Sequence, residues 1–151
     1  GHPHRSISKL VVDLSFREKK KLFASILQEE VVPLSIFETK LSGLKSLVVY
    51  LKDVREKSIK EISKALNRER TTIYSTYTNV KHKKPKLNTK SSIHVPLIIF
   101  SNRKFSVLES LVSYLKDEQN ITLAEISRTL NKSPSTIKTV YWRYKKKCLK
   151  K

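Results

Sequence analysis

An internal repeat is the feature that most constrains what this chain can fold into. Residues 44–83 and 108–147 align with an offset of 64, and 18 of the 40 aligned positions are identical. The string Val-Pro-Leu also recurs, at residues 32–34 and 95–97, with an offset of 63. Because self-similarity of this kind indicates a duplicated structural unit, we expect both copies to adopt one fold of about 50 residues.

The second copy contains the signals of two short helices joined by a turn. Thr122 and Glu125 have the Thr-x-x-Glu spacing of a capping box, which predicts a helix start. Apolar residues at helical spacing follow, namely Leu123, Ile126 and Leu130. Asn131 tolerates the left-handed conformation that ends a helix. Ser133 then offers an N-cap and Pro134 a first helical position, so the stretch predicts a helix-turn-helix unit.

The repeat extends this prediction to three helices in each copy. In the first copy we expect helices over about Leu44–Val54, from Ser58 onward, and over about Arg70–Val80; in the second, over Val107–Glu118, from Thr122 onward, and over Pro134 to about Lys147. The predicted fold class is all-α, with two tandem three-helix helix-turn-helix domains at residues 31–80 and 93–147. Since a unit of about 50 residues is marginally stable alone, we expect the copies to pack on each other.

The remaining segments are assigned from local patterns. Residues 1–30 form a predicted helical extension, in which Ser15 and Glu18 cap a helix from Phe16 to about Gln28. We interpret this helix as packing on the following domain, with dimerisation or phosphate contact as alternatives. Residues 81–92 are predicted to be an exposed basic linker and residues 148–151 a basic tail. The Val-Pro-Leu lead-in is predicted to be either an extended strap or a short helix that begins at proline.

The charge points to a polyanionic partner. The chain has 32 Lys and Arg against 13 Asp and Glu, a net charge of +19. Such an excess repels itself and favours nucleic acid first and an anionic membrane surface second. A highly charged surface adapted to a cell interior is the remaining explanation. The single cysteine cannot form an internal disulfide, which favours a cytoplasmic protein. No apolar run approaches about 18 residues, so we expect no membrane-spanning segment. With nucleic acid as the favoured partner, we expect a nucleoid-associated protein and no membrane partner.

The outward side of each third helix carries the candidate DNA contacts. Its residues are short hydrogen-bonding or cationic groups, which suit base edges and phosphates. Arg68 and Lys132 lie in the turns, beside a helix N-terminus that favours phosphate. The predicted set is Arg68, Arg70, Thr71, Thr72, Tyr74 and Ser75 in the first copy, and Lys132, Ser133, Ser135, Thr136, Lys138, Thr139, Arg143 and Lys145 in the second.

Some residues of these helices have packing interpretations as well. Thr72 and Thr136 are adjacent to a predicted buried isoleucine and fit a structural role as well as DNA contact. Tyr77 and Tyr141 are interpreted as core residues. Trp142 has no counterpart in the first copy, and we favour packing over a seam rather than stacking on a partner.

Residues 59–73 and 123–137 carry a family resemblance. The second reads Leu-x-Glu-Ile-Ser-x-x-Leu-Asn-x-Ser-x-x-Thr-Ile, and the first shares its Glu-Ile-Ser, Leu-Asn and Thr-Ile elements. Each copy resembles the helix-turn-helix of sigma-factor region 4 and related bacterial and archaeal regulators. The resemblance implies recognition by residues 71, 72, 74 and 75 and by residues 135, 136, 138 and 139. The lead-in and tandem arrangement differ from an ordinary sigma factor, so the resemblance implies a tandem DNA-binding module.

No residue pattern predicts catalysis. The four histidines are scattered, and neither Cys-x-x-Cys, His-Glu-x-x-His nor a Gly-rich phosphate loop occurs. We therefore expect no enzyme activity, metal or cofactor. The predicted function is sequence-specific binding of double-stranded DNA by a transcriptional regulator. Alternatives are an RNA-binding module or a module that docks on RNA polymerase or another protein, and a homodimer is compatible with each. If a two-fold axis relates the copies, they would read a near-palindromic DNA site. If the copies have the same orientation, they would read a direct repeat.

Overall fold

The computed structural model describes residues 15, 17–19, 30–83 and 85–150, and this part of the chain is mostly helical, as predicted. Copy one (residues 31–81) contains β1 (Val31–Pro33), the 3-10 helix η1 (Leu34–Phe37), α3 (Gly43–Val49) continued by the π-helix η2 (Tyr50–Val54), α4 (Ile59–Leu66) and α5 (Arg70–Lys81). Copy two contains β2 (His94–Pro96), η3 (Leu97–Ser101), α6 (Val107–Ser113) continued by η4 (Tyr114–Glu118), α7 (Leu123–Leu130) and α8 (Pro134–Leu149). The last helix thus extends past the predicted domain end at 147 into the predicted basic tail.

The N-terminal extension is described only around its predicted helix start. The backbone amide of Glu18 donates to Ser15 Oγ at 3.2 Å, and Ser15 Oγ donates to the Glu18 carboxylate at 2.9 Å. The other residues of the predicted helix lie outside the described residues, except for residues 17 and 19. The predicted packing of that helix is therefore untested.

The lead-in combines the two conformations that the sequence left open. Each copy begins with a three-residue strand that ends at Pro33 or Pro96, and a 3-10 helix follows at once. Proline has no amide hydrogen, so it cannot donate a hydrogen bond that would continue the pairing of the two strands. Its fixed φ also suits the residue before a helical turn. Both proline residues have extended backbone, with φ of −67° and −64°.

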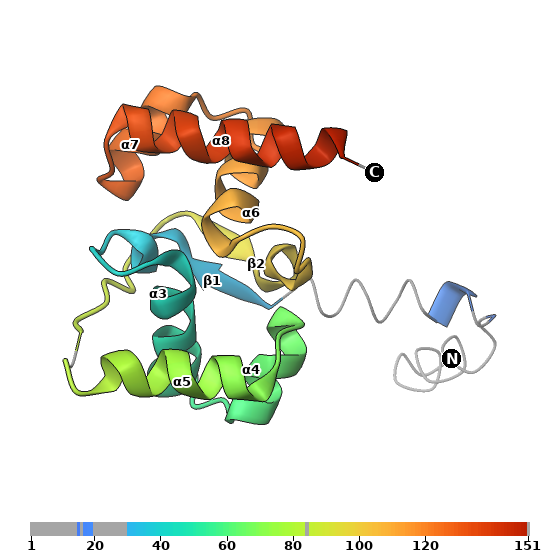
Figure 1. The fold of residues 1–151 in the computed structure, drawn as a ribbon, viewed down its shortest axis with the longest axis vertical. Helices are drawn as coiled ribbons and strands as arrows, with labels where there is room; N and C mark the ends of the chain where they lie inside the picture. The colour runs from blue at the N-terminus through green and yellow to red at the C-terminus, as the bar shows by residue number, and fades with distance from the viewer. Residues whose placement is uncertain (1–14, 16, 20–29, 84, 151) are drawn as a thin grey trace, which may run out of the picture.

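The two strands relate the copies by a local two-fold axis. β1 and β2 pair antiparallel, with Val32 opposite Val95, its own equivalent in the repeat. Two hydrogen bonds repeat the same relation: the Leu34 amide donates to Ile93 O at 2.9 Å, and the Leu97 amide donates to Glu30 O at 2.8 Å. In Figure 1, α5 and α8 accordingly lie at opposite ends of the long axis and run in opposite directions.

The copies share one hydrophobic core. Phe37 and Phe100, again equivalent positions, are buried with their ring centroids 5.7 Å apart. Gly43 faces its equivalent Val107 so closely that an added Cβ would lie 3.0 Å from Val107 Cγ1. α4 packs on η3 and α7 on η1, and the buried apolar residues of both copies form a single cluster. The copies are thus halves of one packed body.

The segment between the copies is exposed at most of its described residues, as predicted, but it is also anchored to the body of the protein. Leu87 is half-buried against the core, and Ser35 Oγ donates to the backbone oxygen of Asn88 at 2.6 Å. An apolar side chain gains free energy by leaving water, and the buried Ser35 hydroxyl needs an acceptor. The segment therefore helps to cover copy one.

The turns follow the sequence closely. Asn67 and Asn131 end α4 and α7 in the left-handed conformation, with φ of 53° and 54°. Ser63 Oγ donates to Arg68 O, and Ser127 Oγ donates to Lys132 O, so each serine holds the turn that follows its helix. The Ser58–Glu61 capping box is complete, whereas Thr122 accepts from the Glu125 amide without the reciprocal bond.

The ends of the π-helices give a stability prediction. Glu56 and its equivalent Asn120 both have left-handed backbone, with φ of 55° and 57°. Asparagine tolerates this conformation better than glutamate. Glu56→Asn is therefore expected to raise the free energy of unfolding in urea by about 0.5–1 kcal/mol. The reverse change Asn120→Glu is the control and should lower it; a loss of stability in Glu56→Asn would contradict the explanation.

Candidate nucleic-acid interface

The third helices of the two copies present the predicted contact residues to solvent. α5 is fixed by buried Ile73 and Val80, and α8 by buried Ile137 and Val140. The predicted residues on the opposite sides are exposed: Arg70, Thr71, Thr72, Tyr74 and Ser75 on α5, Ser133 at the N-cap of α8, and Ser135, Thr136, Lys138, Thr139, Arg143 and Lys145 on α8. The same fold thus leaves equivalent surfaces free in both copies.

The charge of these helices has one sign. Neither α5 nor α8 contains Asp or Glu within its bounds. The basic residues of α8 are Lys138, Arg143, Lys145, Lys146 and Lys147, while α5 has Arg70 and Lys81. The excess of positive charge on α8 attracts phosphate through Coulomb forces, which salt screens. On α5 the excess is smaller, because the N-cap residue Glu69 lies directly before Arg70.

The N-terminus of α8 is organised by hydroxyl groups. Ser133 Oγ accepts from the Thr136 amide at 3.2 Å and lies 2.7 Å from Thr136 Oγ1. Thr139 Oγ1 donates to the Ser135 carbonyl at 2.9 Å, which leaves its lone pairs to accept a further bond. These side chains are held in place on the exposed end of the helix.

Arg68 and Lys132 make contacts within the chain. Arg68 donates through Nη1 to Leu66 O at 2.9 Å and Phe100 O at 3.0 Å, and through Nη2 to Phe105 O at 3.1 Å. Lys132 Nζ donates to Thr39 O at 3.2 Å. Arg68 therefore bridges from the turn of copy one to η3 and the following loop of copy two, and Lys132 bridges from the turn of copy two to the loop after η1 in copy one. Their donors serve packing of the copies, so we do not place them in the interface.

The surroundings of Arg68 affect its basicity. Burial lowers the pKa of Arg68 below its ordinary value, and the positive charge of Arg103 acts in the same direction. A guanidinium is so basic that it keeps its proton at neutral pH. Arg68 therefore remains a charged donor to the carbonyl groups that it bridges.

Tyr77 and Tyr141 are packing residues in equivalent environments. Tyr77 donates to Asp53 Oδ1 at 2.6 Å and Tyr141 to Asp117 Oδ1 at 2.7 Å. The hydrogen bond to Asp53 is the main cause that raises the pKa of Tyr77, whereas burial is the main cause for Tyr141. Both phenols stay protonated at neutral pH and tie the third helix to the π-helix of its copy.

Trp142 is exposed, so the favoured packing interpretation is wrong. Its side chain is 60% exposed, and Lys146 Nζ lies 4.8 Å from the ring centroid. The preceding residue Tyr141 and the nearby Tyr144 occupy the inward side of α8, where their rings stack with centroids 6.2 Å apart. Lys146 is not among the predicted DNA contacts, although its spacing of four residues from Trp142 places both on one side of the helix.

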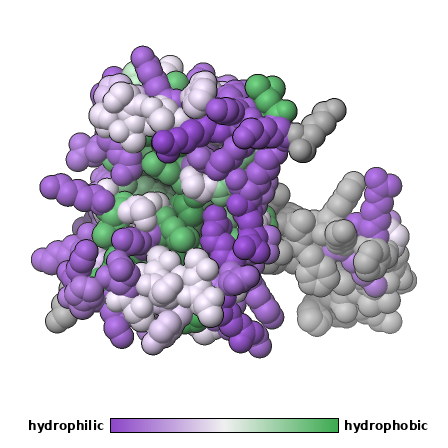
Figure 2. Space-filling view, viewed as in Figure 1, coloured by the Kyte–Doolittle hydropathy of each residue, from purple (hydrophilic) through white to green (hydrophobic). Residues whose placement is uncertain are grey.

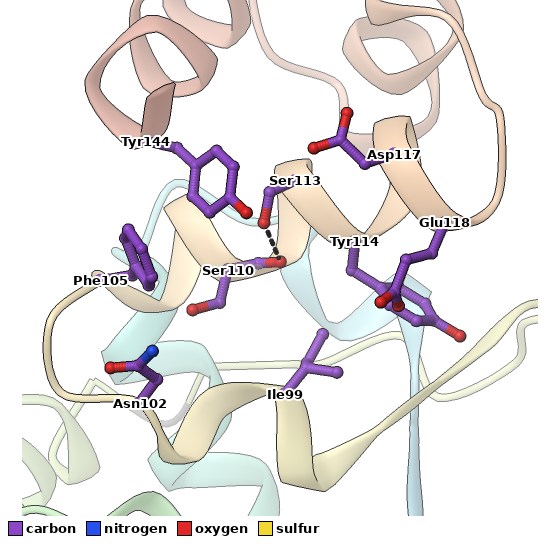
Figure 3. A pocket seen from close by; sticks show the side chains of 9 residues that line it. All are labelled: Ile99, Asn102, Phe105, Ser110, Ser113, Tyr114, Asp117, Glu118 and Tyr144. Atoms are coloured by element: carbon purple, nitrogen blue, oxygen red, sulfur yellow. Dashed lines mark hydrogen bonds between the residues drawn. The ribbon is translucent and has the colours of Figure 1, made fainter. Parts of the chain in front are cut away.

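Figure 3 shows a hollow beside α8 that is part of the packing between α6, η3 and α8. It measures about 200 Å³, and Ser110, Ser113 and Tyr144 are among the residues that line it. Ser113 Oγ donates to the Ser110 carbonyl at 3.0 Å, and Tyr144 packs on Phe105 with centroids 4.8 Å apart. This volume lies below the roughly 300–1,000 Å³ of most small-ligand sites.

The face that contains α5 and α8 differs in hydropathy between its helices and its centre. Figure 2 shows hydrophilic and neutral side chains over the two helices, and hydrophobic atoms in the recess between them. Among the described residues, no group of three His, Cys, Asp or Glu side chains is arranged to hold a metal ion. Within the same part of the chain, no helix has the length and apolar character needed to cross a membrane.

Comparisons with known proteins leave this arrangement without a match. No family model fits the chain, and neither a curated protein nor a solved structure is similar to it. The functional interpretation therefore rests on the residues and contacts described above.

Proposed function

We propose that this protein is a transcriptional regulator that binds double-stranded DNA through two helix-turn-helix units, with α5 and α8 as recognition helices. The observation that carries the proposal is the pair of exposed, carboxylate-free helices on opposite sides of a local two-fold axis. Each follows a short helix and a left-handed asparagine, the arrangement that the resemblance to sigma-factor region 4 implies. No enzymatic role or cofactor is part of the proposal.

The two-fold relation specifies the form of the site. Two recognition helices related in this way insert into successive major grooves about 34 Å apart and read half-sites in inverted orientation. The half-sites differ because Tyr74 occupies the position of Lys138, and Arg70 that of Pro134. The proposed target is thus near-palindromic with unlike halves, bound by one chain in the manner of a dimer.

The individual contacts divide by chemistry. Lys138 is the cation best placed on α8 to reach guanine acceptors or phosphate, and Arg70 has this role on α5. Hydroxyl groups near the two helix starts, including those of Thr72 and Thr136, suit base edges or phosphate oxygens. Arg143 and Lys145 lie further along α8 and suit the phosphate backbone.

Salt dependence tests this proposal. Binding to a labelled 40-base-pair duplex should weaken linearly in a plot of log K against log salt, because each phosphate contact releases counterions. With six to ten contacts, affinity should fall by about 10³- to 10⁵-fold between about 50 and 200 mM salt. Lys138→Gln should reduce the slope by about one, whereas Lys90→Gln, outside the recognition helices, should leave it unchanged. A slope near zero would remove the basis of the proposal.

Protein docking is the second candidate function. The hydrophobic recess in Figure 2 and the 60% exposure of Tyr74 favour it, because exposed apolar groups mark protein contacts. RNA polymerase is one partner of this kind. Weak duplex binding together with tight binding to a purified polymerase would favour docking, and stronger competition by structured RNA than by duplex DNA would favour RNA binding.

A further inference from the structure

Trp142 and Lys146 form an exposed pair that packing does not explain. Trp142 is the only tryptophan of the chain, and Lys146 Nζ lies 4.8 Å from its ring centroid. An α-helix turns by about 100° per residue, so Ser135, Thr139, Trp142 and Lys146 follow one outward stripe of α8. The pair therefore continues the stripe that begins with two proposed DNA contacts.

Trp142 and Lys146 lie further along α8 than the proposed DNA contacts Ser135 and Thr139. At about 1.5 Å per residue, Trp142 lies about 10 Å beyond Ser135, and Lys146 about 6 Å further. The major groove is about 12 Å wide. If the N-terminal end of α8 enters the groove, residues this far along the helix reach the strand that forms its wall.

We propose that Trp142 and Lys146 together bind the sugar–phosphate backbone of duplex DNA where α8 leaves the major groove. The indole face packs on a deoxyribose, its N–H donates to a phosphate oxygen, and the Lys146 ammonium pairs with the same phosphate. The inference rests on the proposed function of α8. The existing contact between ammonium and indole holds the two groups close together before DNA arrives.

The contact belongs to one half-site only. The equivalent positions in copy one are Thr78 and His82, and α5 ends at Lys81 whereas α8 extends to Leu149. Thr78 also donates to the Ser75 carbonyl at 3.2 Å and lacks an aromatic face. Copy two therefore holds its half-site more strongly, and independently of base sequence.

The fluorescence of Trp142 tests the inference directly, because no other tryptophan contributes. Free protein and protein saturated with a 40-base-pair mixed-sequence duplex are titrated with acrylamide, while anisotropy of labelled duplex reports binding separately. We expect at least a twofold lower quenching constant in the complex. Trp142→Ala should weaken binding about two- to fivefold without altering the salt slope. Lys146→Gln should reduce that slope by about one.

Each outcome has a distinct meaning. Duplex binding with unchanged acrylamide quenching would overturn the backbone contact and leave the proposed function standing. Absence of duplex binding at low salt would overturn both. Circular dichroism of each variant checks its fold, and Leu149→Ala, an exposed apolar change on the same helix, should bind as the parent protein does. Equal losses in Leu149→Ala and Trp142→Ala would also contradict the inference.

Discussion

Phe100→Ala is expected to lower the free energy of unfolding by about 3–5 kcal/mol and to weaken both copies together. The Phe100 side chain is fully buried and contacts Phe37 of the other copy at 5.7 Å between centroids. Removal of the Phe100 ring leaves a cavity beside the local two-fold axis, and the tightly packed residues around it cannot easily shift to fill that cavity. Because the core is continuous, the loss should extend to copy one.

Urea unfolding, followed by hydrogen exchange in the helices of both copies, measures this effect. We expect one transition and reduced protection in α4 and α5 as well as in α7 and α8. Ile98→Ala is the control, since Ile98 lies in the same 3-10 helix but is 37% exposed, and it should cost less than about 1 kcal/mol. Two separate transitions, with copy one unaffected, would show that the copies are independent domains.

Arg68→Ala is expected to reduce the free energy of unfolding by about 2–3 kcal/mol, because the change leaves the carbonyl groups of Leu66, Phe100 and Phe105 without their charged donor. Arg70→Ala provides the matched comparison two residues away. Arg70 is exposed on α5, so its loss should change stability by less than about 0.5 kcal/mol while it weakens duplex binding.

The two arginine variants thus separate packing from DNA contact. Urea denaturation gives the stability of each variant, and anisotropy of a labelled duplex, measured well below the denaturation midpoint, gives its affinity. Arg68→Lys should recover part of the stability, since Lys132 makes a single bond of this kind in copy two. An Arg68→Ala variant with unchanged stability and reduced affinity would assign Arg68 to DNA instead.

Local sequence signals predicted the local structure well. The capping residues Ser58 and Ser106 start helices as expected, and Asn67 and Asn131 take the left-handed conformation at the turns. These features depend on hydrogen bonds within a few residues, which short patterns encode. The mostly helical class follows from the same signals and is confirmed. The exposure of Thr72, Lys138 and their neighbours follows from helical periodicity.

Contacts between the copies could not be predicted in this way. The partners of Arg68 are 32 and 37 residues away, and Lys132 bonds to Thr39 across 93 residues. Both cations lie beside a helix N-terminus, so the local pattern favoured phosphate. The exposure of Trp142 also depends on tertiary structure, because an aromatic residue is more often buried. The repeat predicted that the two copies are related and the marginal stability of each unit predicted that they pack together, but neither gave the antiparallel register of β1 and β2.

Selection of bound sequences from a random duplex pool tests the central claim most directly. The claim is that one chain presents α5 and α8 as two recognition helices related by a local two-fold axis. It predicts enriched sites with two unlike, inverted half-sites whose centres lie about one helical turn, or roughly 10 base pairs, apart. A direct repeat, a single half-site or no enrichment would contradict it.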